Sequence, residues 1–167
     1  MKKLIVILFM TYGTIAFSQK DACVCCSDAY HSFDFWVGTW TVTDSNGNLV
    51  GKNTIEKVEG GCALRERWIS SNGKSTGTSL NFYNGENEQW EQLWIDNSGG
   101  HLKLSGNRKG NQMILSSEGK STPEDQIVKN RITWTLNDNG TVRQQWEVLE
   151  EGQVVTVLFD GLYHKIE

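Results

Sequence analysis

Residues Phe33–Trp40 read Phe-Asp-Phe-Trp-Val-Gly-Thr-Trp, and the change of pattern within this stretch decides the fold. Upstream of it, Ser27 and Asp28 can cap a short helix that runs through Ala29–Phe35. From Trp36 onward the helical period is lost and apolar residues recur at every second position, which is typical of a strand with one buried face. We therefore predict a short N-terminal helix followed by a first strand that starts at Trp36.

Nine turn signals divide the chain from Trp36 onward into ten candidate strands, at about the 8–12-residue spacing of sandwiches and barrels. Most of them contain Asn-Gly or Gly-Gly pairs, which supply the positive φ angles of tight hairpins. The signals are Asn46-Gly47, Gly60-Gly61, Asn72-Gly73, Asn84-Gly85, Ser98-Gly99-Gly100, Asn107–Gly110, Gly119–Asp125, Asn139-Gly140 and Glu151-Gly152. Strands joined in sequence by hairpins predict an antiparallel up-and-down order within one domain.

Period-two alternation assigns all seven tryptophans to one face of these strands. Trp90, Gln92 and Trp94 point one way, for example, while Glu91 points the other. The charged face belongs in solvent because an unpaired charge is costly to bury. A flat ten-stranded sheet would leave two unpaired edges, and closure removes them. We predict an all-β fold: one closed antiparallel barrel over residues 36–167, preceded by a cysteine-containing segment over residues 19–35.

Polar side chains share the inner face with the tryptophans. Core filling accounts for the tryptophans but not for Glu66, Gln92 and Gln144. Buried polar groups need partners, so these three bond to one another, to indole N–H groups, to trapped water or to a ligand. A mainly apolar cavity with a few convergent polar groups is the usual form of a small-molecule site. The candidate ligand-binding residues are Trp40, Glu66, Trp68, Trp90, Gln92, Trp94, Trp134, Gln144 and Trp146.

The overall charge is mildly acidic. The 167 residues carry 16 Lys and Arg against 20 Asp and Glu, a net charge of −4. Removing residues 1–18 deletes two lysines and no acids, which leaves 14 against 20, or −6. A chain of this charge without a basic run argues against binding to nucleic acid or to an anionic membrane. Oligomeric state is left open.

The chain begins like a secretory signal peptide. Lys2 and Lys3 precede a short apolar run over residues 4–10, and Ala16-Phe17-Ser18 places small residues where a signal peptidase needs them. The run is too short for a membrane span. We predict cleavage between Ser18 and Gln19, a periplasmic or secreted protein and no stable membrane insertion.

Four cysteines, Cys23, Cys25, Cys26 and Cys62, follow this leader. In an oxidising compartment an even number of cysteines predicts disulfides, and four allow three pairings. Adjacent cysteines fit disulfide geometry badly, so we expect Cys62 to join the N-terminal segment to the barrel, with Cys26 as its partner. The alternative is a metal site, in which thiolates and His31 would hold Zn²⁺ or Cu⁺.

Several of these motifs together resemble a known family. Gly38-Thr39-Trp40, a Gly-x-Trp at the start of the first strand, resembles the calycin superfamily of lipocalin-like barrels. The longer Phe-Asp-Phe-Trp-x-Gly-x-Trp string is similar to a family of secreted bacterial lipocalin-like proteins of unknown function. Further matches are Gly61-Cys62, Trp90–Asp96, Arg131–Trp134 and Phe159–Tyr163. The resemblance implies a calycin-type barrel and no established catalytic residues.

Ten-stranded relatives of this kind also include nitrobindin-like barrels, in which a late histidine ligates haem iron. His164 lies near the C-terminus here, so haem at His164 is the cofactor alternative that this resemblance raises. The rest of the nitrobindin pattern is not found in the chain. Because residues near a terminus are usually exposed, we expect His164 in solvent and no cofactor.

Three functions compete at this stage. The first is a module that binds a small apolar or amphipathic molecule in a tryptophan-lined cavity. The second is an isomerase or lyase in which buried Glu66, with a raised pKa, acts as general acid or base. The third is a structural envelope protein with a filled barrel and no ligand. No nucleophile–base pair is recognisable, which favours the first function over the second.

Overall fold

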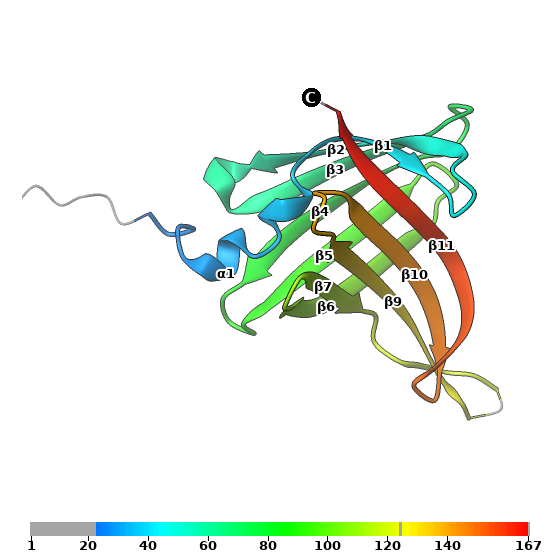
Figure 1. Ribbon diagram of the computed structural model, residues 1–167. Helices are drawn as coiled ribbons and strands as arrows, with labels where there is room; N and C mark the ends of the chain where they lie inside the picture. Colours follow the sequence, from blue (N-terminus) through cyan, green and yellow to red (C-terminus); the bar gives the residue numbers. More distant parts are fainter. Residues whose placement is uncertain (1–22, 124, 167) are drawn as a thin grey trace, which may run out of the picture.

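The computed structural model describes residues 23–123 and 125–166 (Figure 1). Residues 1–18 and the predicted cleavage before Gln19 lie outside this range. In chain order the elements are α1 (Asp28–His31), η1 (Asp34–Trp36), β1 (Gly38–Thr43), β2 (Leu49–Val58), η2 (Glu59–Gly61), β3 (Ala63–Ser70), β4 (Thr76–Asn84), β5 (Gln89–Asp96), β6 (His101–Lys109), β7 (Gln112–Ser116), β8 (Lys120–Ser121), β9 (Ile127–Leu136), β10 (Val142–Glu150) and β11 (Gln153–Ile166).

The strands form one closed antiparallel barrel. β1 to β7 pair in chain order, β7 pairs with β9, and β9, β10 and β11 continue the series until β11 pairs with β1. The two-residue β8 pairs only with the start of β9 and is not one of the strands that close the barrel. Ten strands therefore close the barrel, which confirms the predicted all-β, up-and-down class. No strand of the ring is left with an unpaired side along its whole length.

The predicted alternation is clearest in the first strand of the wall. In β1, Trp40 and Val42 are buried and their neighbours are not. The hairpin that follows uses an Asn-Gly turn: Gly47 has φ +82°, and Asp44 Oδ1 accepts hydrogen bonds from the backbone N–H groups of Asn46 and Asn48. Local turn chemistry and strand patterning therefore agree at this hairpin.

The segment before the barrel differs from the sequence prediction. The helix α1 ends at His31, and Trp36 belongs to the 3₁₀ turn η1, so that the first strand starts at Gly38. Residues three apart lie on the same side of a 3₁₀ turn, which brings Phe33 and Trp36 together beneath the barrel. Burial of both aromatic side chains outweighs the local preference for a longer helix.

The disulfides correct the predicted pairing. Cys25, not Cys26, is bonded to Cys62, and Cys23 is bonded to Cys26. A turn brings the backbones of Cys23 and Cys26 together, with Cys26 N–H donating to the Cys23 carbonyl. Cys25 lies between them and faces the barrel, where it is buried. All four thiols are bonded, so none is left as a thiolate for the metal site considered above.

No helix within residues 23–123 and 125–166 is long and apolar enough to cross a membrane.

Candidate functional site

One end of the barrel is closed by an aromatic plug, which we define as Phe33, Trp36, Trp90 and Trp134. Phe33 stacks on Trp36 with ring centroids 5.0 Å apart, and its ring edge-packs with Trp90 at 5.5 Å and with Trp134 at 5.1 Å. All four side chains are 0–1% exposed. Such geometries add to the burial energy of aromatic side chains, so this end is a packed core.

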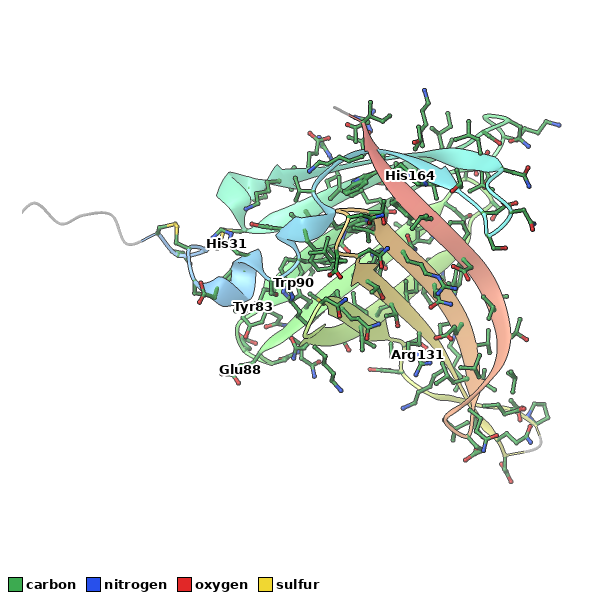
Figure 2. The ribbon with its side chains drawn as sticks, in the orientation of Figure 1. His31, Tyr83, Glu88, Trp90, Arg131 and His164 are labelled. Carbon is green, nitrogen blue, oxygen red and sulfur yellow. A yellow bond between two sulfur atoms is a disulfide. The ribbon has the colours of Figure 1, made fainter. Side chains whose placement is uncertain are left out.

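Residues 23–36, which precede β1 and which we call the plug segment, are attached to the barrel wall by covalent and ionic contacts. The Cys25–Cys62 disulfide joins it to the residue just before β3. Asp34 accepts a hydrogen bond from Lys57 Nζ at 2.5 Å, and His31 Nδ1 lies 2.9 Å from the same carboxylate. Figure 2 labels His31 and Trp90 in this region, beside α1. The plug segment is thus held at the closed end of the barrel by the Cys25–Cys62 disulfide and by the Lys57–Asp34 ion pair.

Two buried indoles near this end bond to the plug segment itself. Trp40 Nε1 donates to the Trp36 carbonyl at 2.9 Å, and Trp90 Nε1 donates to Ser32 Oγ at 2.7 Å. These indoles therefore serve to dock the segment. The polar residues of the inner face are not their partners.

The other end of the barrel holds a cavity of about 240 Å³ that opens to solvent. This is somewhat below the roughly 300–1,000 Å³ of typical drug-sized sites. It is lined by Glu66, Trp68, Ser75, Gln92, Trp94, Asp96, Leu102, Ile132, Gln144, Trp146, Leu158, Phe159 and Tyr163. The apolar lining is aromatic and aliphatic, and within the described part of the chain its only charged side chains are two carboxylates.

Glycines in the wall keep this cavity open. A Cβ atom at Gly51 would overlap the Trp68 ring, and one at Gly77 would overlap the Trp94 ring. Each indole therefore lies in close contact with a glycine of the neighbouring strand. Glycine within a strand often marks such a close approach. Because the rings rest against the wall, they line the lumen and do not fill it.

A chain of hydrogen bonds crosses the floor of the cavity, and we call its members the polar network. Its members are Gln144, Tyr163, Asn53, Glu66, Ser79, Asn81 and Gln92, contributed by β10, β11, β2, β3, β4, β4 and β5. Asn53 Nδ2 donates to Glu66 Oε1 at 2.7 Å and Ser79 Oγ donates to Glu66 Oε2 at 2.6 Å. The donors on both sides of Glu66 thus converge on one carboxylate.

The two ends of the polar network are glutamine amides that line the cavity. Gln92 Nε2 donates to Asn81 Oδ1 at 2.7 Å, and the Tyr163 hydroxyl donates to Gln144 Oε1. The network therefore uses the amide nitrogen of Gln92 and the amide oxygen of Gln144. The second polar atom of each amide remains for a molecule in the cavity.

Glu66 is the ionisable centre of this site. Burial raises its pKa from 4.5 to about 7, although the hydrogen bonds from Ser79 and Asn53 favour the ionised form. Tyr163 nearby is buried as well, and burial together with the charge of Glu66 raises its pKa well above 10.0. At neutral pH the tyrosine keeps its proton, while Glu66 is close to half ionised.

Six of the nine predicted ligand-binding residues line the cavity, and three do not. The six are Glu66, Trp68, Gln92, Trp94, Gln144 and Trp146. Trp90 and Trp134 belong to the plug and Trp40 is bonded to it through Trp36; all three are 1% exposed and absent from the lining. Alternation assigns a side chain to the inner face, but it does not say at which depth of the barrel that side chain lies.

His164 lies on the outer face of β11, as expected. It is exposed (Figure 2), and its ring nitrogen is 3.4 Å from Thr43 Oγ1. The preceding Tyr163 is buried at 1% exposure and lines the cavity. Successive side chains of a strand point to opposite faces. His164 therefore does not face the lumen, and a haem held inside the barrel would have no ligand there.

Sequence reasoning missed part of the site. The residues that it missed are buried and polar: Asn53 on β2, and Ser79 and Asn81 on β4. Between the latter two, Leu80 faces outward and is 45% exposed. Along this part of β4 the polar residues face inward and the apolar residue faces outward, so the sequence pattern does not identify the inner face. Leu158 and Phe159 both line the cavity because a bulge shifts the β10–β11 register between Trp146 and Glu147.

Fold and site together define a class: a closed antiparallel barrel, consistent with a calycin or lipocalin-like architecture, with one end filled and one end hollow. Searches of protein-family models and of curated proteins find no match. Because one fold can carry many functions, the function of this barrel is set by the residues of its site.

Proposed function

We propose that this is an exported protein that binds a small apolar or amphipathic molecule in the open half of its lumen. The observation that carries the proposal is the position of Trp68 and Trp94, whose rings lie directly against Gly51 and Gly77 of the wall beside a cavity of about 240 Å³. A barrel selected only for stability would fill this space, because packed interiors are more stable than hollow ones.

Export is part of the same proposal. Two disulfides fit an oxidising compartment, and the first 18 residues have the n-region, apolar run and small residues of a signal peptide. The expected location is the periplasm or the medium, after cleavage between Ser18 and Gln19.

The first test is native mass spectrometry of the protein purified from a bacterial periplasm, compared with its mass after denaturation. A mass excess that disappears on denaturation is the expected result. A chain that carries only the loss of four hydrogens, one pair for each disulfide, would show that nothing stays bound through purification. In that case the second test decides.

The second test measures the affinity of the neutral dye N-phenyl-1-naphthylamine. Gln92→Leu and Trp94→Ala change the lining of the cavity, whereas Leu93→Ala, on the same strand, changes the outer face, where Leu93 is 44% exposed. We expect the first two variants to alter dye affinity and the third to leave it unchanged. Equal behaviour of all three, or no dye binding at all, would contradict the proposal and favour a structural protein without a ligand.

A specific observation supports an enzyme as the second candidate. Glu66 has a pKa of about 7 in a water-accessible cavity, which suits a general acid or base near neutral pH. The reaction would be an isomerisation or elimination, in which Glu66 moves one proton. Glu66→Gln should then abolish activity while dye binding persists, and activity that survives this substitution would exclude the role.

A further inference from the structure

The cavity of the proposed binding protein is asymmetric in charge. Among the residues that the structure describes, 23–123 and 125–166, Glu66 and Asp96 are the only carboxylates in its lining, and no lysine, arginine or histidine lies in it. The basic residues of the surrounding strands instead face outward. Arg65 pairs there with Glu56, Arg131 with Glu147 and Arg143 with Asp160.

Glu66 is buried without a counter-ion in the described part of the chain. It is 4% exposed, and its partners are the amide of Asn53 and the hydroxyl of Ser79, both neutral. None of the ion pairs among residues 23–123 and 125–166 includes it. A buried carboxylate without a cation is costly, and an arriving cation would relieve that cost. Each carboxylate oxygen accepts one hydrogen bond from the network and has a further lone pair for a ligand.

Asp96 supplies a second negative charge at the mouth. Its Oδ1 accepts hydrogen bonds from Ser98 N–H at 2.8 Å and from Gly100 N–H at 3.0 Å. The hydrogen bond from the Ser98 hydroxyl, followed by these two backbone bonds, lowers the pKa of Asp96 below 3.8. Asp96 is thus ionised wherever the protein is folded near neutral pH.

Aromatic faces complete the arrangement. Trp68, Trp94, Trp146 and Phe159 line the same cavity, and Trp68 meets Phe159 edge to face at 6.0 Å. The face of an indole attracts cations, and desolvated sites strengthen this attraction. Aromatic walls with two carboxylates and no basic group disfavour a fatty acid or another organic anion.

We propose that the ligand is a small organic cation, an amine or a quaternary ammonium with an apolar body, whose charged end lies toward Glu66 and whose body packs against the tryptophans. This inference rests on the proposed binding function and names the chemistry of its ligand. The apolar body accounts for the aromatic lining, and the charge accounts for the unpaired carboxylate.

The test compares four probes that share one body and differ in charge. They are 3-phenylpropylamine, 3-phenylpropyltrimethylammonium, 3-phenylpropan-1-ol and 4-phenylbutyrate, titrated calorimetrically at pH 8 into the protein purified from the periplasm. We expect both cations to bind about tenfold or more tightly than the alcohol, and the carboxylate to bind most weakly. Glu66→Gln should reduce the preference for the cations while the affinity for the alcohol is kept.

Glu91→Gln is the matched control. Glu91 lies on β5 and pairs with Asn84 on the outer side, so its neutralisation removes the same charge from outside the lumen. The cation preference should remain in this variant. Retained binding of the alcohol shows that Glu66→Gln is folded, and far-UV circular dichroism checks this independently.

The outcomes separate the two proposals. Binding of the alcohol or the carboxylate as tightly as the amines would overturn the cation inference and leave the binding function standing. A cation preference that survives Glu66→Gln would also overturn it. If no probe binds and N-phenyl-1-naphthylamine does not bind either, both proposals fail together.

Discussion

Tryptophan has opposite roles at the two ends of this barrel. At the closed end, Trp36 and Trp134 are packed against Phe33 and are at most 1% exposed. At the open end, Trp68 and Trp94 lie over glycines of neighbouring strands and border a cavity. The residue type is the same and the alternation is the same. What differs is the neighbour: a segment that enters the lumen at one end, and a glycine that lets the ring withdraw to the wall at the other.

The comparison shows that an inward tryptophan does not by itself indicate a core or a site. Its role is set by whether other side chains reach the same depth. The polar network lies between the two regions and separates an apolar, filled end from a hollow, acidic one. Substitutions at each level should therefore have different consequences for stability and for binding.

The largest effect should come from the plug. Phe33→Ala removes a side chain that is fully buried and packs against four tryptophan or phenylalanine rings. We expect a loss of about 3–5 kcal/mol in the free energy of unfolding. Trp94→Ala at the open end should cost about 1 kcal/mol, because its ring already faces a cavity. Urea unfolding of both variants measures the difference, and equal losses would mean that the two ends are packed alike.

The disulfides come next. Removing the Cys25–Cys62 bond, which spans 37 residues, with alanine at both positions should cost about 4 kcal/mol of unfolding free energy. Removing Cys23–Cys26, which spans 3 residues, should cost about 2 kcal/mol. Urea titrations of the two double variants provide the comparison. A larger loss for the short loop would contradict the view that the long one fastens the plug segment.

The polar network predicts a dependence of stability on pH. The pKa of Glu66 is raised from 4.5 to about 7 in the folded protein, so the folded state holds a proton that the unfolded chain has already released between these values. The unfolding free energy should therefore fall as pH rises from about 4.5 to 7, by at most about 3 kcal/mol, and level off above.

Glu66→Gln should remove this part of the slope, and Glu56→Gln on the outer face should retain it. Unfolding curves at a series of pH values test the prediction. A wild-type protein that gains stability relative to Glu66→Gln across this range would reverse the expected sign.

The smallest effect concerns the wall glycines. Gly77→Ala places a methyl group where the Trp94 ring lies, so the ring must move into the lumen. We expect roughly a tenfold loss of N-phenyl-1-naphthylamine affinity, which corresponds to about 1.4 kcal/mol of binding free energy. Gly85→Ala, whose new methyl group would meet only Tyr30 Oη at 3.7 Å, is the control at the closed end. Unchanged affinity in Gly77→Ala would show that the ring position does not set the size of the site.

Much of the architecture could be predicted because it depends on local periodicity. The Asn-Gly turns and the alternation around Trp40 and Trp90 are features of short stretches, and they gave the strand count, the antiparallel order and the inner face. The pairing of Cys25 with Cys62 could not be predicted in this way. It depends on which of three nearby cysteines a turn directs toward the barrel.

The residues of the site also fall into two groups, those that the sequence pattern identifies and those that it does not. Glu66, Gln92 and Gln144 are identifiable from sequence because they interrupt an apolar face. Ser79 and Asn81 are not, because Leu80 between them is apolar and faces outward. Asn53 is not, because its neighbours Lys52 and Thr54 are polar as well, so nothing in the pattern marks an inner face there. Leu158 enters the lining through a bulge, and a bulge changes the register without changing the hydrophobic pattern that precedes it.

The sequence by itself thus determined a closed, outward-charged antiparallel barrel with aromatic and polar residues inside, because side-chain period and turn chemistry act over a few residues. Only the tertiary structure decided which tryptophans are core and which line a cavity. That distinction depends on contacts between strands and on where Phe33 enters the lumen. These contacts join residues distant in the chain, and close packing, which acts in three dimensions, selects among them.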